Sequence, residues 1–408
     1  MSSTRRAPMG SHFRQEKYAS SAEFEIGLNA ILVARRCSLL TDPKEIELIW
    51  FLQHLSHQQG GLKKVAEDNF AIFPKQIRKS AAFLDQTSDL LREICLNPST
   101  SPSAIKSLSC KNLYHTLQMY CSHVAETSLA GLVKTEIGEV VIDSLNYAEH
   151  QKALVLIEGN ARIGKTFATK AWCEACPGKR RYVQAPSSND MTVFFRTVAK
   201  ALGLAASYTR KANELRVRIS DVLQTGQLML VIDEAHYLFP QINVRRALPA
   251  RINWLLTELV NFGVAVALIS TPQFTTSQRV IEKNTHWASE QLIGRMARYT
   301  RLPERLEQND LEAVARYHLP EGDRKSISAL VGYAQASRKY LAGIDHATKA
   351  ARYEAQIRNR TKVTFDDIKN AIATNVMPSD FALREALAPV RKRSVFCGEA
   401  RNIKQPCI

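Results

Sequence analysis

The residues in this chain best suited to chemistry form a glycine-containing loop that ends in Lys165 and Thr166. The stretch ALVLIEGNARIGKTF, residues 153 to 167, contains the pattern G-x-x-x-x-G-K-[ST] between an apolar run and a helical pattern. Glycines let backbone amides surround phosphates, and the start of a helix attracts anions. The pattern therefore predicts an ATP-binding loop in which Lys165 contacts the β- and γ-phosphates and the Thr166 hydroxyl ligates Mg²⁺. The predicted cofactor-binding residues of the loop are Gly159, Asn160, Ala161, Arg162, Ile163, Gly164, Lys165, Thr166 and Phe167.

Two adjacent carboxylates follow a second apolar run, LMLVIDEAH, residues 228 to 236. A carboxylate at the tip of a strand beside the loop can hold Mg²⁺ through water, which is the predicted role of Asp233. Glu234 is then placed to activate a water molecule as general base. By themselves these acids would indicate a helix cap or a solvated turn, but the loop upstream favours the catalytic interpretation.

Two further groups are candidates for contact with the γ-phosphate. Ser270 and Thr271 end the run GVAVALIST, and either hydroxyl could orient the attacking water. In QLIGRMARYTRL, we expect Arg295 and Arg298 on one face of a helix, suitable for reaching the nucleotide of a neighbouring subunit. The alternative is a solvated basic helix face.

The segment WCEAC, with Cys173 and Cys176, offers a competing chemistry, because this spacing occurs in dithiol oxidoreductases. In those proteins the first cysteine begins a helix, whose dipole lowers the pKa of the thiol. Here both cysteines are predicted near the end of the helix that Lys165 begins, before Pro177 and Gly178, where the dipole disfavours a thiolate. No second CxxC completes a zinc site. We therefore expect packing rather than redox or metal chemistry.

The elements around these motifs alternate between short apolar runs and helical patterns, which is typical of a parallel sheet covered on both faces. We predict a three-layer α/β nucleotide-binding domain with a helical lid, preceded by an all-α domain. The expected divisions are a disordered tail at 1–23, a helical N-terminal domain at 24–96, a linker and helix at 97–131, the α/β core at 132–302, the helical lid at 303–388 and a basic tail at 389–408.

The charge of the chain indicates a polyanionic partner. The 408 residues carry a net charge of +16, and nucleic acid is the leading candidate, although a basic surface can also serve solubility alone. The sequence has no apolar run long enough to span a membrane and no apolar core of a secretory signal, so we expect a cytoplasmic protein.

The same segments resemble the AAA+ ATPases, and among them the Mu B type, the target-selection ATPases of DNA transposition. LVKTEIGEVVIDSLNYAEHQKALVLIEGNARIGKT looks like the first helix, strand and loop of that family, and LMLVIDEAHYL is similar to its second motif. ASRKYLAGIDHATKAA followed by VTFDDIKNAI looks like its helical lid. The resemblance covers about Leu132 to Thr374.

The resemblance implies further roles and partners. Arg295 or Arg298 would be the arginine finger, Thr271 or Ser270 the first sensor, and Arg338 the second sensor in the lid. Members of the family bind ATP, assemble as rings or helical filaments on duplex DNA, and hand a target site to a transposase or integrase. The alternative is an adaptor or regulatory switch of the same fold, whose hydrolysis resets a protein–protein interaction.

DNA contacts are less defined in the sequence. Residues 62 to 83, LKKVAEDNFAIFPKQIRKSAAF, are compatible with a helix-turn-helix and equally with an ordinary helical hairpin. On charge and position alone, the candidates for loops that face DNA are Lys179, Arg180, Arg181, Arg245, Arg246 and Arg251.

Overall fold

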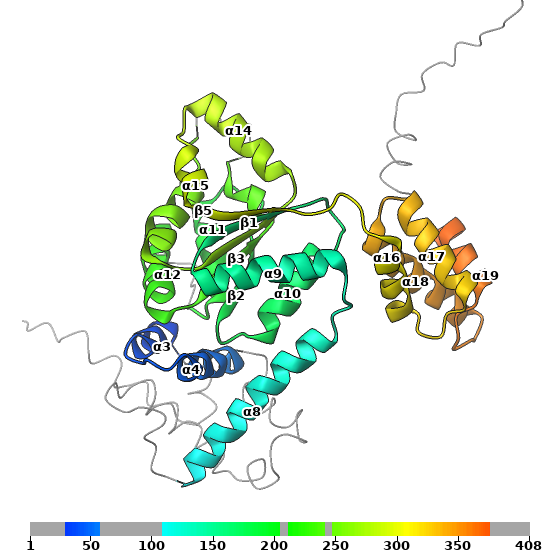
Figure 1. Ribbon diagram of the computed structural model, residues 1–408, viewed down its shortest axis with the longest axis horizontal. Coiled ribbons are helices and arrows are strands. Elements are labelled where there is room, and N and C mark those ends of the chain that lie inside the picture. The colour runs from blue at the N-terminus through cyan, green and yellow to red at the C-terminus, as the bar shows by residue number, and fades with distance from the viewer. Residues whose placement is uncertain (1–28, 58–107, 205–210, 241–246, 376–408) are drawn as a thin grey trace, which may run out of the picture. The chain divides into compact units, whose positions relative to one another are not determined.

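The computed structural model describes residues 29–57, 108–204, 211–240 and 247–375, which form two compact units divided after Leu306. Figure 1 shows the described elements, and each unit is treated by itself below. Several sequence predictions lie outside the described residues: the tail at 1–23, the possible helix-turn-helix at 62–83, Arg245 and Arg246, and the tail at 389–408.

The first unit is built on a parallel sheet whose five described strands have the order β2-β3-β4-β1-β5. The strands are β1 (Leu154–Glu158), β2 (Arg180–Gln184), β3 (Met229–Asp233), β4 (Val266–Ser270) and β5 (Met296–Arg301). Glu158 pairs with Ser270 at the carboxyl ends of β1 and β4, and Gln184 pairs with Asp233 at the ends of β2 and β3. The predicted loop and the predicted acids therefore leave the sheet at one edge.

Helices cover the sheet on both sides. The described helical elements of this unit are α3 (Ala30–Cys37), α4 (Pro43–Ser56), α8 (Leu108–Ala130), α9 (Glu136–Gln151), α10 (Lys165–Ala175), α11 (Met191–Ala201), α12 (Ala212–Gly226), η2 (Ala235–Leu238), α13 (Ala250–Trp254), η3 (Leu255–Leu259), η4 (Val260–Phe262), α14 (Gln273–Thr285) and α15 (Glu290–Arg295).

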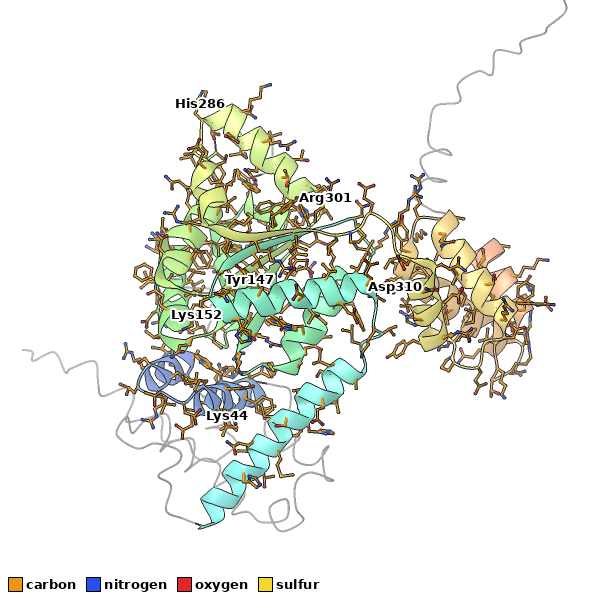
Figure 2. The ribbon with its side chains drawn as sticks, in the orientation of Figure 1. Lys44, Tyr147, Lys152, His286, Arg301 and Asp310 are labelled. Atoms are coloured by element: carbon orange, nitrogen blue, oxygen red, sulfur yellow. The ribbon has the colours of Figure 1, made fainter. Side chains whose placement is uncertain are left out.

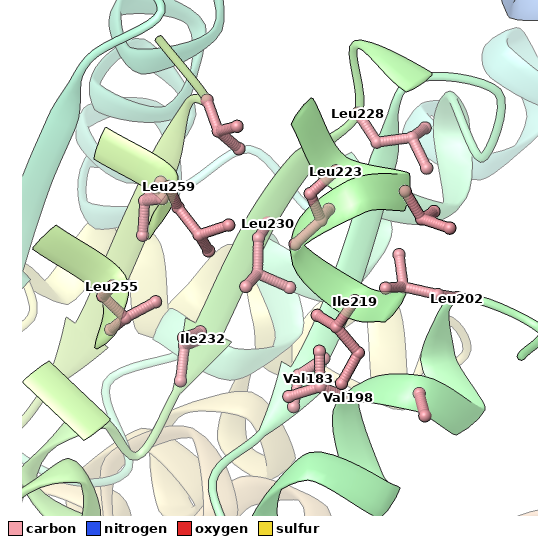
Figure 3. Close-up of a cluster of buried hydrophobic side chains, with 14 of the residues drawn as sticks. Val183, Val198, Leu202, Ile219, Leu223, Leu228, Leu230, Ile232, Leu255 and Leu259 are labelled. Atoms are coloured by element: carbon pink, nitrogen blue, oxygen red, sulfur yellow. The ribbon is translucent and has the colours of Figure 1, made fainter. Parts of the chain in front are cut away.

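Every residue of β1, β3 and β4 is buried, and alternate residues point to opposite faces of the sheet, as the pleat of a strand requires. Leu230 and Ile232 of β3 pack with side chains of α11, α12 and η3, which Figure 3 shows at close range. Val231, between them, is also fully buried, and so are Val155 and Ile157 of β1. Because both faces of the sheet are covered, the predicted three-layer α/β architecture is confirmed.

The helices α3 and α4 of the expected N-terminal domain share a core with the sheet. Trp50 of α4 is fully buried, and its indole Nε1 donates a hydrogen bond to the carbonyl of Gly226 at 2.7 Å. Residues of α3 and α4 belong to the same buried cluster as β3 and α12. These two helices therefore stabilise the first unit directly.

The strand β5 corrects one sequence prediction. We expected Arg295 and Arg298 on one helix face, but α15 ends at Arg295 and residues 296–301 form β5, parallel to β1. Arg301, labelled in Figure 2, is the last residue of this strand. MARYTR contains good helix formers, and pairing with β1 decides its conformation, because tertiary contacts override weak local preference.

The second unit is helical in its described part, with α16 (Gln308–His318), α17 (Arg324–Ala336), α18 (Tyr340–Ile357), α19 (Phe365–Asn370) and η5 (Ala371–Asn375). Asp367 is buried and accepts hydrogen bonds from Arg358 and Arg360, while its carboxylate also caps α19 together with Thr364. In neither unit is a described helix both long and apolar enough to cross a membrane.

Candidate functional site

The loop that follows β1 has the backbone of a phosphate-binding turn. The amide of Gly159 donates a hydrogen bond to the carbonyl of Ser270 at 3.1 Å. A side chain at this position would place its Cβ 2.8 Å from Cβ of Leu302, so the packing requires glycine. Gly164 has a φ of 98° and caps α10, which begins at Lys165. The motif thus stands between a strand and a helix start, as predicted.

Lys165 is buried at the start of α10 and lies against the loop. Its Nζ donates hydrogen bonds to the carbonyl oxygens of Gly159 at 2.8 Å and Asn160 at 2.6 Å. Burial lowers the pKa of this ammonium, whereas Asp233 and Glu234 act in the opposite direction. A cation held here, between the loop and two carboxylates, is suited to bind terminal phosphates.

The side chain of Asp233 joins the loop to β3. Its Oδ2 accepts hydrogen bonds from the Thr166 hydroxyl at 2.7 Å and from the Tyr182 phenol at 2.9 Å, and its Oδ1 accepts from the backbone amide of Glu234 at 2.8 Å. The residue is 2% exposed. The structure therefore brings together the two residues predicted to hold the metal.

The oxygens of Thr166 and Asp233 fit a magnesium ion. A hydroxyl and one carboxylate beside a phosphate-binding loop are the protein ligands that Mg²⁺ uses with a nucleotide, since it takes its other ligands from phosphates and water. Within the described residues, no group of three or more His, Cys, Asp or Glu side chains could hold a metal alone. When bound, the ion would neutralise phosphate charge during transfer.

Glu234 and His236 follow Asp233 at the edge of the sheet. Glu234 has a left-handed backbone, with a φ of 53°, and its carboxylate is partly exposed. Nδ1 of His236 lies 3.5 Å from Oε2 of Glu234 and 3.4 Å from Oγ of Ser270. Burial lowers the pKa of His236, which favours neutral imidazole at neutral pH. The imidazole thus lies between the predicted base and β4.

Two residues at this site were not identified from the sequence. Tyr182 lies on β2. Burial, followed by the charge of the adjacent Asp233, raises the pKa of its phenol. The phenol therefore stays protonated and donates a hydrogen bond to Asp233. His236 was within reach of sequence reasoning because it follows the acids by two residues. Tyr182 had no local signal, because its contact depends on the pairing of β2 with β3.

The remaining loop residues differ in exposure. Ile163 is buried, whereas Asn160, Ala161, Arg162 and Phe167 are exposed. The side-chain Nδ2 of Asn160 donates a hydrogen bond to the carbonyl of Glu304 at 3.1 Å. Phe167 is 58% exposed although it is a large apolar residue next to Thr166. An exposed aromatic ring here is available to a ligand that has a flat apolar part.

Thr271 follows Ser270 at the end of β4. Its hydroxyl oxygen is buried and forms no hydrogen bond within the described part of the chain. A buried polar atom without a partner is uncommon in proteins and is expected mainly where another group binds. Of the two candidate hydroxyls, this one is therefore the better placed to meet a ligand.

The two candidate finger residues make different contacts. Nη2 of Arg298 forms an ion pair with Asp143 of α9 at 2.7 Å, and its guanidinium lies 5.4 Å from the ring of Tyr147, which Figure 2 labels. Arg295 ends α15 and donates to Asn261 at 2.8 Å and to the carbonyl of Gln291 at 3.0 Å. Arg298 is thus ion-paired with a carboxylate of α9, whereas Arg295 makes only neutral contacts, one to η4 and one to its own helix.

Arg338 lies in the second unit, in the turn after α17, and has a φ of 53°. It is exposed. Its predicted role as second sensor stays a prediction.

The structure places Cys173 and Cys176 where the sequence indicated, at the end of α10. Burial raises the pKa of both thiols, so neither is a ready thiolate. The geometry of the helix thus supports the packing interpretation over dithiol chemistry.

Two of the basic residues considered for DNA contact are buried, which corrects that expectation. Arg181 and Arg251 are each 4% exposed. Arg181 donates to the backbone of Pro177 and to Gln53, and Arg251 donates to the backbone of Tyr237 and Ser188. Their guanidinium groups are therefore engaged in hydrogen bonds within the first unit.

The other two described candidates are engaged in ion pairs. Arg180 pairs with Glu149 at 2.8 Å and stacks on Trp172, and Lys179 pairs with Glu47 at 2.9 Å. The charge of this cluster is therefore largely compensated within the first unit.

Comparison with known families matches residues 148–277 to the AAA domain. The match contains the loop, the acids and Thr271, and it ends before Arg295, Arg298 and Arg338. A comparison with curated proteins gave no match.

Solved structures that align with part of this chain include two proteins. The Aeropyrum pernix ORC2 protein, solved in ADPNP-ADP complexes, is 15% identical over 59% of this chain and 68% of that chain, with a TM-score of 0.44. The Thermotoga maritima RuvB Holliday junction branch migration motor is 14% identical over 59% of this chain and 69% of that chain, with a TM-score of 0.38. From the family match and the site geometry, residues 148–277 form an AAA-type P-loop ATPase domain.

Proposed function

We propose that the protein is an ATP-dependent DNA-binding ATPase that assembles on duplex DNA and directs a transposase or integrase to its target. The observation that carries the enzymatic part is the meeting of Lys165, Thr166 and Asp233 at one edge of the sheet. In this proposal Lys165 contacts the β- and γ-phosphates, and Thr166 and Asp233 hold Mg²⁺.

Hydrolysis requires a water molecule in line with the γ-phosphate and a group to accept its proton. Glu234 is assigned as that base, because its carboxylate is partly exposed beside Asp233. The buried hydroxyl of Thr271 is assigned to orient the water or the γ-phosphate. The exposed ring of Phe167 is suited to pack against the adenine.

We assign the arginine finger to Arg295 rather than Arg298. A finger must leave its own subunit to reach a neighbour's nucleotide, and Arg298 would first have to break its ion pair with Asp143. Arg295 has to release only Asn261 and a backbone carbonyl. This assignment requires a homo-oligomer, either a ring or a helical filament.

Binding to duplex DNA is supported by the net charge of +16, since sequence-independent binding consists mainly of phosphate neutralisation. The transposition role is inferred from the resemblance to Mu B type ATPases in the segments around the loop and the lid. The cytoplasmic location stays a prediction.

A single experiment tests the ATPase and DNA parts together. Gel shifts on non-specific duplex DNA, with and without ATP at about 50 and about 200 mM salt, are combined with hydrolysis assays with and without DNA. We expect ATP-dependent binding that weakens with salt, and DNA-stimulated hydrolysis. Hydrolysis without DNA binding at either salt concentration would reject the DNA role and favour the adaptor or switch.

A further inference from the structure

The position of Thr271 is determined by contacts on both sides of it. It is the first residue after β4, and α14 begins two residues later at Gln273. A side chain in such a short connection can move only as far as the strand end before it and the helix start after it allow. The contacts of Ser270 and of the first turn of α14 therefore decide where the Thr271 hydroxyl lies.

Ser270 and the first turn of α14 contact two adjacent residues, Gly159 and Glu158, where β1 meets the phosphate-binding loop. On the strand side, the carbonyl of Ser270 accepts a hydrogen bond from the amide of Gly159 at 3.1 Å. On the helix side, the amide and hydroxyl of Thr275 donate to Oε1 of Glu158 at 3.0 and 2.8 Å. Thr271 is thus held between a backbone contact to Gly159 and a side-chain contact to Glu158.

Glu158 is a buried acid, only 3% exposed, at the last position of β1. Its carboxylate also accepts a hydrogen bond from the phenol of Tyr299 at 2.8 Å. Since Thr275 is the third residue of α14, the negative charge lies at the helix end where the dipole favours it. Burying a carboxylate is costly unless hydrogen bonds compensate it, and here the donors are Thr275 and Tyr299.

The bond from Tyr299 provides an internal comparison. The Thr275 hydroxyl lies 2.9 Å from Oε2 of Glu158, the same oxygen that accepts from Tyr299, but Tyr299 belongs to β5 whereas Thr275 belongs to α14, which follows Thr271. Loss of the Tyr299 phenol would remove a donor to the same carboxylate without releasing the start of α14.

We propose that Glu158 is a positioning residue for ATP hydrolysis: it binds Thr275 and thereby fixes the Thr271 hydroxyl relative to the phosphate-binding loop. This inference rests on the proposed ATPase function. Glu158 does not touch the nucleotide in this scheme and acts only through α14. Its loss should therefore slow the chemical step and leave nucleotide binding nearly unchanged.

The test uses the full-length chain and four single variants: Glu158→Gln, Thr275→Val, Tyr299→Phe and Thr271→Ala. Nucleotide affinity is measured by titration with a fluorescent ATP analogue, and kcat by phosphate release. We expect Glu158→Gln and Thr275→Val to lower kcat about tenfold while the Kd stays within about twofold, since small misplacements of a reacting group have effects of this size. Tyr299→Phe, the matched control, should keep both values within about twofold.

The double variant Thr271→Ala with Thr275→Val separates positioning through Thr271 from general loosening. If Thr275 acts through Thr271, the double variant should be no slower than Thr271→Ala alone. Multiplicative losses in the double variant, or a loss of kcat in Tyr299→Phe equal to that in Thr275→Val, would overturn the inference. So would an increase of the Kd that accounts for the whole defect. A wild-type chain that binds but does not hydrolyse ATP would reject the proposed function, and this inference with it.

Discussion

The hydroxyl of Thr166 donates a hydrogen bond to the carboxylate of Asp233 at 2.7 Å, although 67 residues separate the two in the chain. Thr166 belongs to the helix after β1, and Asp233 ends β3, with β4 between the two strands. The contact joins the loop and the second motif into one site. A Mg²⁺ ion bound with a nucleotide needs oxygen ligands from both segments. The contact between Thr166 and Asp233 is therefore the main structural support for nucleotide binding.

Lys165→Ala should abolish nucleotide binding. The Nζ atom of Lys165 is the cation that the loop holds, bonded to the carbonyls of Gly159 and Asn160, and terminal phosphates carry charge that the loop amides alone do not neutralise. Titration with a fluorescent ATP analogue, beside circular dichroism to confirm folding, measures the effect. Retention of wild-type affinity by a folded variant would contradict the assigned role.

Glu234→Gln should bind ATP and stall before hydrolysis. The change keeps the size of the side chain and its place beside Asp233 but removes its ability to accept a proton. We expect kcat to fall by about a hundredfold or more, with the Kd for ATP nearly unchanged. Single-turnover assays measure the chemical step directly. Normal turnover in this variant would remove Glu234 as the base.

The chemistry of the loop could be predicted from sequence because phosphate binding demands local features. Gly159 and Gly164 are needed for close packing and for a φ of 98°, and Lys165 begins the helix that the phosphates require. Apolar runs before each motif indicated buried strands, which the structure confirms for β1, β3 and β4. These features depend on neighbours along the chain, which a sequence displays.

Contacts between distant segments could not be predicted in this way. Tyr182 meets Asp233 only because β2 pairs with β3, and Glu158 meets Thr275 only because α14 starts above the end of β1. Arg181 and Arg251 were expected at the surface because charge usually remains there, but backbone carbonyls within the core bind them. The burial and the hydrogen-bond partners of such residues depend on the packing of the whole unit.

Arg295→Ala should impair hydrolysis in the assembled protein, whereas Arg298→Ala should have a smaller effect. A finger supplied to a neighbour contributes to the transition state, and Arg298 is bound to Asp143 in its own subunit. Hydrolysis rates of the two variants, at concentrations where oligomers form, decide between them. A larger loss in Arg298→Ala would reverse the assignment.

Mixing two inactive variants tests whether Arg295 acts between subunits. A Lys165→Ala subunit keeps its finger, and an Arg295→Ala subunit keeps its nucleotide site. If the finger acts in trans, the mixture should recover part of the activity, because some interfaces combine the two intact halves. Absence of recovery in oligomers shown to be mixed would place the action of Arg295 within its own subunit.

The cysteine pair should be dispensable for hydrolysis. Cys173 and Cys176 lie at the end of α10, and burial raises the pKa of both thiols. We expect the double variant Cys173→Ala with Cys176→Ala to hydrolyse ATP at close to the wild-type rate, with a modest loss of stability from the cavity at Cys173. Phosphate release and thermal unfolding measure the two effects. A folded variant without activity would give the pair a functional role.

His54 should make the first unit sensitive to mild acid. Burial, followed by the charges of Arg181 and His57, lowers the pKa of His54 to about 4. In the unfolded chain the pKa of this histidine is near 6.5, so the unfolded state binds a proton at a higher pH than the folded state does. The contribution of His54 to the free energy of unfolding is therefore complete above pH 6.5 and is lost as the pH falls toward 4. Between pH 7 and pH 5 this residue should account for a loss of about 2 kcal/mol in the free energy of unfolding.

Urea unfolding followed by tryptophan fluorescence measures this effect in the right place, because the chain has 4 tryptophans and Trp50, Trp172, Trp254 and Trp287 all lie in the first unit. His54→Gln is the control, since glutamine is polar and does not titrate. Carboxylates elsewhere change the stability of both proteins alike, so the informative quantity is the difference between their pH slopes. The wild-type should lose more stability than His54→Gln between pH 7 and pH 5, and equal slopes would show that His54 is not held in its neutral form.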